Sequence, residues 1–350
     1  MTLRSELLAI CRRSNCEAIL QTIQGVNGVR GSVKLIEGDR AVAILVPTAP
    51  SLPMLPGRAG RSIRKHIATR AVGRLRLLEA LHGVSDVLPA VPGQKLNRRQ
   101  AAIFLSGNAT RLDEMLASAA GMEEWQVTID WDTASVLSHF KDAPELAPAL
   151  AGNSVAPDAL ARGVAVLRAR LSHDFMQILD PILSAAELLP PQDADTTVLS
   201  AAIMTGRRSR AALDTALARI DATWTDGLRL RIIGPYPPAT FRGISIRMAT
   251  ASEVAQATKL LGAGADWRSA DLRQLRRHAL RDTHPESSGH TREPSAATIG
   301  KAYDLLSDLG NCTAGDVDAA LRGNGFPLAS TIRQTGQTSA PAPNISRSAA

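Results

Sequence analysis

The stretch Leu228–Phe241, with the sequence LRLRIIGPYPPATF, constrains the fold more than any other part of the chain. Its first half alternates and is rich in branched aliphatic residues, which predicts a buried β-strand. Its second half contains a glycine and three prolines, which remove backbone donors and fix φ. We therefore expect the chain to leave the sheet at Gly234 in a rigid corner. The corner residues are Gly234, Pro235, Tyr236, Pro237, Pro238 and Phe241.

Length and cysteine content limit the class of protein. A chain of 350 residues can bury two or three small cores. It has no run of about 18 apolar residues, so we expect no membrane-spanning helix. Charges interrupt the first 18 residues, where a secretory signal would need an apolar segment, so we expect no such signal. Three cysteines suit a reducing cytoplasm better than a disulfide framework. Cys11 and Cys16 are not accompanied by a second Cys or His pair at the spacing of a zinc finger, so we expect no zinc site. We expect no other cofactor either.

The positive charge suggests acidic partners. A net charge of +7 and a pI near 9.8 are compatible with nucleic acid or an acidic protein surface. Aromatic residues make up only 3% of the chain and do not interleave the basic stretches, which disfavours a surface that stacks single-stranded nucleic acid. A basic nucleic-acid-binding protein stays an alternative, which predicts binding with a steep salt dependence. A helix predicted at Arg61–Leu81 carries a basic face, which fits an acidic partner or a merely solvated surface. The basic residues that we single out on this face are Arg61, Arg64, Lys65 and Arg70.

Hydrophobic patterning divides the chain into two α/β units. We place the first in residues 1–140, where Thr2–Leu20 has a helical or degenerate pattern. A hairpin, a helix, an edge strand, a second helix and an alternating strand follow: Val33–Ile36 with Ala41–Val46, Arg61–Leu81, Val84–Val91, Asn97–Ala120 and Trp125–Trp131. This order predicts one sheet with helices on one face.

The second unit is predicted in residues 158–250, after a Pro- and Ala-rich linker at 141–157. It begins with a long helix, Asp158–Leu189, which Pro181 kinks. A strand (Thr196–Thr205), a helix (Arg207–Trp224) and the strand that begins at Leu228 follow. A short strand at Ile244–Met248 follows. Residues 251–325 read as short helices, and 336–350 as a disordered tail.

No constellation of catalytic residues stands out. The seven histidines show no HExxH-type pairing, and His173-Asp174 has no nucleophile motif beside it. A Gly-rich phosphate-binding loop would need a preceding strand and a third glycine. Gly262-Ala263-Gly264 has neither, so we expect a turn there. We therefore expect no enzymatic activity.

Three separated segments resemble the gas vesicle accessory protein family F/L. The corner resembles its GPWPPYSF-type signature, with Tyr236 where Trp is usual and Ala239 where Tyr is usual. Val87–Gln94 (VLPAVPGQ) is similar to the family's VLPxxFG segment, with Pro92 in place of an aromatic residue. Leu96–Trp131, ending GMEEWQVTIDWD, is similar to its helix and G-x-E-W-x-V-K-V-type strand. The likeness covers roughly 41–241, and the aromatic strand that usually opens the family is replaced by Thr2–Leu20.

This resemblance implies an α+β protein with two ferredoxin-like domains. It also implies a non-enzymatic, cytoplasmic assembly factor, associated with gas vesicles, that binds the hydrophobic shell protein and other accessory proteins. The corner is then a structural element first and a partner contact second, because proline-stiffened loops lose little entropy on binding.

A second likeness lies near the C-terminus. Leu261–Ser287 followed by Ile299–Leu306 is similar to a J domain, with His284-Pro285-Glu286 where the family has His-Pro-Asp. The helical pattern directs four arginines to solvent, which are Arg273, Arg276, Arg277 and Arg281. The resemblance implies a co-chaperone that recruits a DnaK-type ATPase. Glutamate adds one methylene to a tightly positioned carboxylate, so we expect a J-like fold without full J activity.

Overall fold

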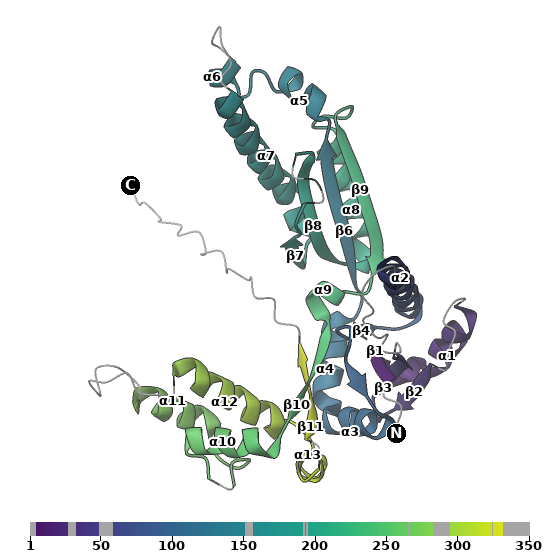
Figure 1. The fold of residues 1–350 in the computed structure, drawn as a ribbon, viewed down its shortest axis with the longest axis vertical. Helices are drawn as coiled ribbons and strands as arrows, with labels where there is room; N and C mark the ends of the chain where they lie inside the picture. Colours follow the sequence, from purple (N-terminus) through teal and green to yellow (C-terminus); the bar gives the residue numbers. More distant parts are fainter. Residues whose placement is uncertain are drawn as a thin grey trace.

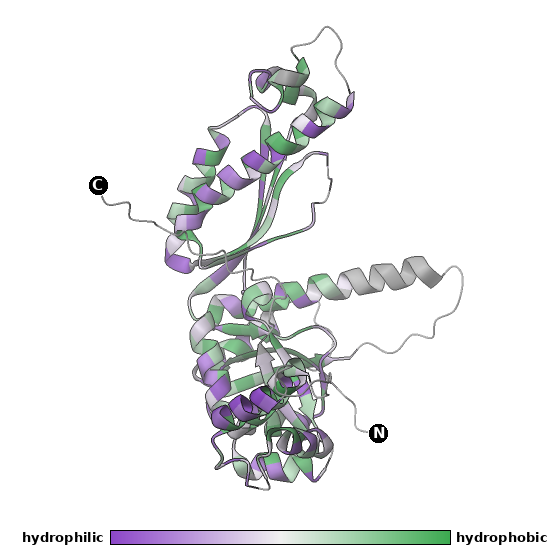
Figure 2. Cartoon of the chain, turned by 90° about the vertical axis from the view of Figure 1, so that its left-hand side faces the viewer, coloured by the Kyte–Doolittle hydropathy of each residue, from purple (hydrophilic) through white to green (hydrophobic). Residues whose placement is uncertain are grey.

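The computed structural model describes residues 5–26, 33–48, 59–150 and 157–331, except 192, 194, 265, 283–294 and 324. Two α/β bodies are stacked end to end, and a helical arm leaves the first body to one side (Figure 1). Hydrophobic residues concentrate in the strands of both bodies, and much of the polar colour lies on the helices (Figure 2). The predicted α+β class is confirmed. The predicted tail at 336–350 lies outside the described residues.

The first body is built on a four-strand antiparallel path. Its elements follow the order β-α-β-β-α-β: β1 (Ser5–Arg12), α1 (Cys16–Gly25), β2 (Lys34–Glu37), β3 (Ala41–Pro47), α2 (Ala59–Val84) and β4 (Val87–Pro89). The strands lie in the order β2-β3-β1-β4, and the short β5 (Lys95–Leu96) also pairs with β1. This is the ferredoxin-like arrangement that the resemblance implied, and β4 is an edge strand as its proline predicted.

The prediction for the N-terminal segment was wrong, because β1 is the central strand of this sheet. Its residues divide between two cores, with Leu7 and Ile10 on one face and Leu8, Ala9 and Cys11 on the other. A bulge between Leu7 and Ala9 breaks the alternation. A strand buried on both faces has no polar alternation, so its apolar run looks the same as a buried helix. The aromatic opening strand of the family is thus replaced by an aliphatic one.

Helices cover both faces of the first sheet. The helices α1 and α2 pack on one face, and α3 (Arg98–Gly107) and α4 (Ala109–Ala119) on the other. Asn97 begins α3 with a capping box closed by Gln100. The single helix predicted from Asn97 is broken at Asn108, whose side chain bonds strand β11 (Phe326–Thr331) instead of facing solvent.

The second body repeats the same topology. It comprises β6 (Met122–Trp131), α7 (Pro157–Leu179), β7 (Ala185–Leu188), β8 (Thr197–Gly206), α8 (Arg210–Asp221) and β9 (Leu228–Tyr236). The strand order is β7-β8-β6-β9, and both helices pack on one face over Trp125, Val127 and Ile129. The predicted strand at Trp125–Trp131 exists, but its place in the first sheet was wrong, since β6 pairs with β8 on one side and β9 on the other.

Two segments of the second body differ from their prediction. The long helix ends at Leu179, and Pro181 lies in a 3₁₀ turn (Asp180–Ile182) that leads into β7. The predicted linker at 141–157 contains α6 (Ala147–Leu150) after α5 (Thr133–His139). Leu146 is fully buried in the second core, so residues 141–150 are part of the packed body.

The C-terminal part returns to the first body. After α9 (Ala239–Arg242), strand β10 (Ile244–Ala249) pairs with β11, and Ile244 bridges to Ala90 beside β4. The described residues between the two strands form α10 (Ala251–Leu261), α11 (Leu272–Asp282), α12 (Ala296–Gly310) and α13 (Ala314–Leu321). Phe326 of β11 packs against Gly107, where a Cβ would lie 2.5 Å from the Phe326 ring. The sequence pattern did not indicate β11.

Candidate functional site

The corner lies where the chain crosses from the second body back to the first. The strand β9 does not end at Gly234, as predicted, but continues to Tyr236 through a bulge: Tyr236 pairs with Glu124, and Ile233 with Gln126. Nor is β9 buried, because it is the edge strand and only Leu228 is fully covered. The bulge accommodates the glycine and proline that sequence reasoning took as the end of the strand.

Gly234 is required at the bulge. Its φ is +146°, and a Cβ there would lie 2.8 Å from both the Glu124 carbonyl oxygen and the Trp125 ring. Residues that carry a side chain rarely adopt a backbone conformation with this φ. We expect Gly234→Ala to lower the free energy of unfolding of the second body by about 2 kcal/mol, measured by urea denaturation.

Gly300→Ala is the matched control for this substitution, because Gly300 lies in α12 with nothing within 4 Å of its added Cβ. We expect this variant to be neutral or slightly stabilising. Equal losses from the two substitutions would contradict a special role of the bulge.

A buried carboxylate holds the corner in place. Glu124, at the start of β6, is 3% exposed and accepts hydrogen bonds from the Thr240 N–H at 2.8 Å and the Thr240 hydroxyl at 2.6 Å. Thr240 lies in α9, so this contact ties together the outgoing and returning segments of the chain. Burial raises the pKa of Glu124, partly offset by the bonds from Thr240. Sequence reasoning missed Glu124, because an alternating pattern does not show which polar residue lies under a corner.

This raised pKa predicts a pH dependence. The folded protein binds the Glu124 proton more tightly than the unfolded chain, so stability falls as pH rises from about 4.5 through the raised pKa. In Glu124→Gln the amide can accept from the Thr240 N–H and donate to its hydroxyl. We expect this variant to fold and to lose that pH dependence in thermal unfolding scans.

Glu114→Gln, at an exposed position, serves as control for Glu124→Gln and should keep the wild-type profile. An unchanged profile in Glu124→Gln would assign the pH dependence to another group.

A second polar contact joins the two bodies beside the corner. Arg207 follows β8 and donates to the carbonyl oxygen of His82 at 2.7 Å, and it lies 3.4 Å from the Glu123 carboxylate. The Arg207 backbone N–H bonds to Gly121, whose own N–H donates to Asp86. Burial and the neighbouring arginine lower the pKa of His82 to about 4. These contacts make the crossing a polar junction with fixed geometry.

The corner residues differ in how far they are covered. Pro237 and Pro238 are buried, while Tyr236 and Phe241 are half-buried. The helix α9 packs against α4 and β4 of the first body, and α2 lies beside the end of β9 (Figure 1).

The other predicted site residues are separated from the corner. Arg61, Arg64, Lys65 and Arg70 lie on α2, but their side chains are outside the described part of the structure. Arg74 of the same helix points inward and pairs with Glu6 at 3.1 Å, so the basic face does not continue there.

The J-like residues lie on the helical arm. Arg273, Arg276 and Arg277 are exposed on α11, as expected, and Leu272 and Leu275 pack inward. His284, Pro285 and Glu286 lie outside the described residues. The J-domain likeness therefore stays a prediction.

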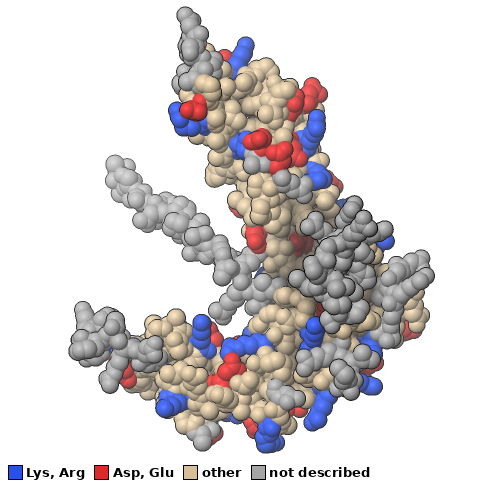
Figure 3. Space-filling view, viewed as in Figure 1, with Lys and Arg blue, Asp and Glu red and all other residues tan. Residues whose placement is uncertain are grey.

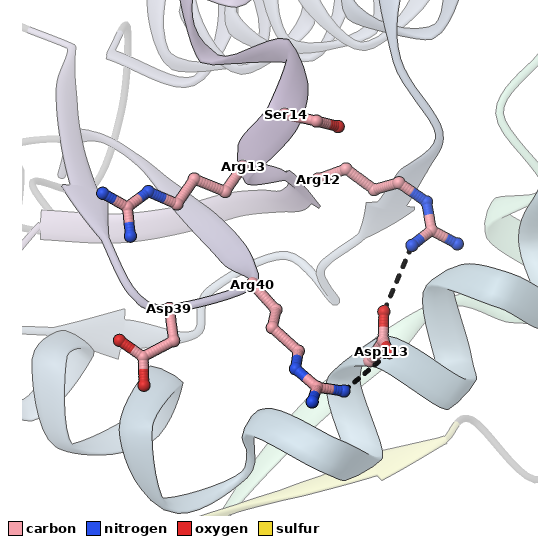
Figure 4. A pocket seen from close by; sticks show the side chains of 6 residues that line it. All are labelled: Arg12, Arg13, Ser14, Asp39, Arg40 and Asp113. Carbon is pink, nitrogen blue, oxygen red and sulfur yellow. Dashed lines mark hydrogen bonds and ion pairs between the residues drawn. The ribbon is translucent and has the colours of Figure 1, made fainter.

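A hollow on the first body contains several charged groups. It has a volume of about 530 Å³ and is lined by Arg12, Arg13, Ser14, Asp39, Arg40 and Asp113 (Figure 4). Arg12 and Arg40 each lie 3.1 Å from Asp113, while Arg13 lies 3.7 Å from Glu37. Each arginine has a carboxylate partner, and the Ser14 hydroxyl donates to the Asn15 side chain at 2.7 Å with no histidine in the lining to activate it. The lining residues therefore provide no catalytic set.

The described residues contain no group of three or more His, Cys, Asp or Glu side chains placed to hold a metal ion. Burial raises the pKa of Cys11 to about 12 and that of Cys312 to about 11, so these thiols stay protonated and are poor nucleophiles. No helix in the described ranges has the length and apolar character needed to cross a membrane. On the face shown in Figure 3, the described basic and acidic side chains are interspersed.

Two solved structures of gas vesicle proteins are similar to this chain. The crystal structure of the gas vesicle protein GvpF from Anabaena sp. PCC7120 has a TM-score of 0.50 and 16% identity, covering 68% of this chain and 94% of that one. GvpF from Microcystis aeruginosa gives a TM-score of 0.43 and 17% identity, covering 68% and 98%. No curated protein matches the chain.

The family model of the gas vesicle synthesis protein GvpL/GvpF matches residues 8–242. That range includes both ferredoxin-like sheets and the corner, whereas β10, β11 and the helices between them lie beyond it. The chain therefore belongs to the gas vesicle synthesis protein GvpL/GvpF family.

Proposed function

We propose that the protein is a non-enzymatic assembly factor that binds the hydrophobic shell protein and other accessory proteins while gas vesicles form. Membership of the GvpL/GvpF family carries this proposal, since the match spans both sheets. The open strand edges add modest physical support, because such an edge can receive a strand of another chain. Action in the cytoplasm, at or near the vesicle, follows from the same proposal.

Pull-down of the tagged full-length chain from cells that grow gas vesicles tests the binding. We expect the major shell protein to be recovered, and vesicles to be lost when the gene is deleted and regained with the wild-type copy. Normal vesicles after deletion, with no shell protein recovered, would contradict the proposal.

A matched variant tests the claim that no catalysis is involved. His173 and Asp174 on α7 form the one His-Asp pair that the sequence singled out. The double variant His173→Gln with Asp174→Asn should restore vesicles as fully as the wild type. Failure of this variant, with normal folding and abundance, would point to chemistry at α7.

The co-chaperone function is a second candidate, favoured by the arginines on α11. Four exposed arginines lie along this helix, which are Arg273, Arg276, Arg277 and Arg281. Arg276 lies over the Tyr303 ring of α12 at 4.8 Å, so the two helices are packed together. Stimulation of a DnaK-type ATPase, measured with the wild type and with Glu286→Asp, tests it. Stimulation by neither form would remove the candidate.

A further inference from the structure

The strand β7 is an edge strand that the helices of the second body leave uncovered. It begins the order β7-β8-β6-β9, so within the described residues no strand pairs with its outer side. Leu188 lies opposite Ala201 of β8, which belongs to the core beneath α7 and α8, and directly opposite residues share one face of a sheet. Leu188 is nevertheless 65% exposed, and Ala186, on the same face, is exposed as well. The helix layer therefore stops short of β7.

A hollow lies between α7 and the chain at the end of β7. It has a volume of about 310 Å³, and its lining is mostly apolar. Ala165 and Ala169 of α7 form one wall, while Leu188, Leu189 and Pro191 form the other. The two alanines are exposed, so their small side chains leave this space open towards solvent. Aliphatic side chains of a partner that lay beside Leu188 would fit here.

The hydrogen-bonding pattern shows which backbone groups of β7 face outward. The Leu189 N–H donates to the Ser200 carbonyl oxygen at 2.8 Å, and the same antiparallel register continues back through β7. In such a ladder, hydrogen-bonded pairs alternate with pairs that are not bonded to each other. Ala186 and Leu188 therefore direct their N–H and C=O groups away from β8, and their side chains lie on the uncovered face beside the hollow.

The strand itself lacks the residues that usually close an edge. Its sequence, AAEL, contains no proline or lysine, and its pairing with β8 has no register shift. Pro190 and Pro191 come only after the strand has ended. Because β7 is short, an added strand gains only the backbone bonds of Ala186 and Leu188. The hollow must supply the rest of the contact.

The open face of β7 carries a negative charge. Glu187 is the charged residue of this strand, and it lies on the face opposite to Leu188. Glu124 of β6 lies on the same face two strands away, and the Glu187 charge contributes to its raised pKa. Neither β7 nor β8 contains a lysine or an arginine. A basic residue beside Glu187 would therefore stabilise an added strand.

This composition disfavours a second copy of the chain as the occupant. Antiparallel pairing of β7 with itself, with Ala186 opposite Leu188, would place the Glu187 carboxylates of the two copies directly opposite each other. Like charges in that position destabilise a sheet. A register shift in one direction pairs Leu188 with Ser184, and a shift in the other pairs Ala186 with Pro190, which has no N–H. A segment with aliphatic residues on one face and a basic residue on the other fits both faces of the edge.

We propose that the outer edge of β7 binds, as an added antiparallel strand, an extended segment of a vesicle protein in which aliphatic and basic residues alternate. Two aliphatic residues of the partner exchange backbone hydrogen bonds with Ala186 and Leu188, and their side chains pack on Leu188 and into the hollow beside α7. The basic residue between them lies beside Glu187. The identity of the partner as a vesicle protein rests on the proposed function, but the chemistry of the edge and the hollow does not.

Peptide binding to the purified full-length chain tests this edge. The probe is a fluorescein-labelled heptapeptide of alternating lysine and valine, followed by fluorescence anisotropy. We expect saturable binding that is about fivefold weaker for a glutamate–valine peptide. N-methylation of the valines should abolish binding, because the valine N–H groups face β7, whereas N-methylation of the lysines should leave it intact. No binding of the lysine–valine peptide, equal binding of both charge versions, or binding that survives methylation of the valines would overturn the proposal.

Variants of β7 locate the bound strand. Leu188→Pro removes one outward N–H and should abolish binding, whereas Ile232→Pro is the matched control on the opposite edge strand β9, where Ile232 is 40% exposed. Glu187→Lys should reverse the preference toward the glutamate–valine peptide, which keeps the test decisive if Leu188→Pro fails to fold. Equal losses in the two proline variants, or an unreversed preference in Glu187→Lys, would contradict the assignment.

A variant of α7 tests the hollow without changing β7. Ala169→Leu fills part of the space between α7 and Leu188 and should weaken peptide binding about tenfold. Ala218→Leu is the control, because Ala218 is exposed on α8 and does not line the hollow. Unchanged binding in Ala169→Leu would remove the hollow from the site.

Sedimentation of the full-length chain tests whether a second copy occupies the edge instead. We expect Leu188→Pro to leave the oligomeric state unchanged. A dimer that Leu188→Pro dissociates would assign the β7 edge to self-association and overturn the proposal.

The peptide assay uses no vesicle protein, so its result is independent of the pull-down. Recovery of shell protein without peptide binding would remove the β7 edge and keep the proposed function. Peptide binding without recovery of any vesicle protein would do the reverse.

Discussion

Replacing Asn108 with leucine is expected to release the C-terminal strand from the first body. The Asn108 side chain is 1% exposed, donates to the Phe104 and Pro327 carbonyl oxygens at 2.8 and 2.9 Å, and accepts from the Ala329 N–H at 2.9 Å. Leucine has a similar volume but leaves the two groups of β11 buried without partners. Each such group costs roughly 1–3 kcal/mol, so we expect a loss of about 4 kcal/mol.

Hydrogen exchange measures this effect where it arises. Amides of β10 and β11 should lose protection in Asn108→Leu, while those of β6 and β8 keep it, because the second body does not contact Asn108. Asn311→Leu is the control, since Asn311 is exposed at the end of α12, and should change stability by about 0.5 kcal/mol or less. Unchanged protection of β11 in Asn108→Leu would show that apolar packing alone holds the strand.

Acid is expected to loosen the junction between the two bodies through His82. The side chain of His82 is 5% exposed, and its pKa falls from 6.5 to about 4 through burial first and Arg207 second. The unfolded chain binds this proton more readily than the folded one. Stability is therefore complete above pH 6.5 and is lost as pH falls from 6.5 towards 4. The full loss is about 3 kcal/mol.

Thermal unfolding from pH 8 to pH 4 with His82→Gln checks this expectation, and the variant should show a shallower decline. His278→Gln, at an exposed histidine of α11, should follow the wild type. The charged neighbours of His82 are Arg207, which lowers its pKa, and Asp86, which raises it. An equally steep decline in His82→Gln would assign the acid sensitivity to other groups.

Sequence periodicity identified individual elements better than their partners. It found the hairpin of β2 and β3, the strands β6, β8 and β9, and the capped start of α3, because propensity, alternation and capping are local. It did not find that β6 pairs with β8, since strand pairing depends on the register of distant segments. The same non-local effect hid β1 and β11. β1 is buried on both faces, and β11 (FPLAST) is held by Asn108 and β10.

The candidate site was predictable in part for similar reasons. The corner was visible from its prolines and glycine, and its resemblance to the family signature was carried by the same residues. The bulge that lets β9 pass through Gly234 was not visible, since a bulge is defined by the partner strand. Glu124 meets Thr240, and His82 meets Arg207, each across more than 100 residues of chain, so no local sequence pattern predicts these contacts.

The return of the chain to the first body sets an order of events during synthesis. The second body has all its strands once Tyr236 has left the ribosome, but β11 follows roughly 90 residues later. At about 5–20 residues per second, that interval lasts about 5–20 s. During it the surface around Gly107 and Asn108 has no strand to cover it, although the sheet beside it can already form. The first body, although it is synthesised first, is therefore completed last. Until β11 is added, the surface around Gly107 and Asn108 is exposed to early partners or to aggregation.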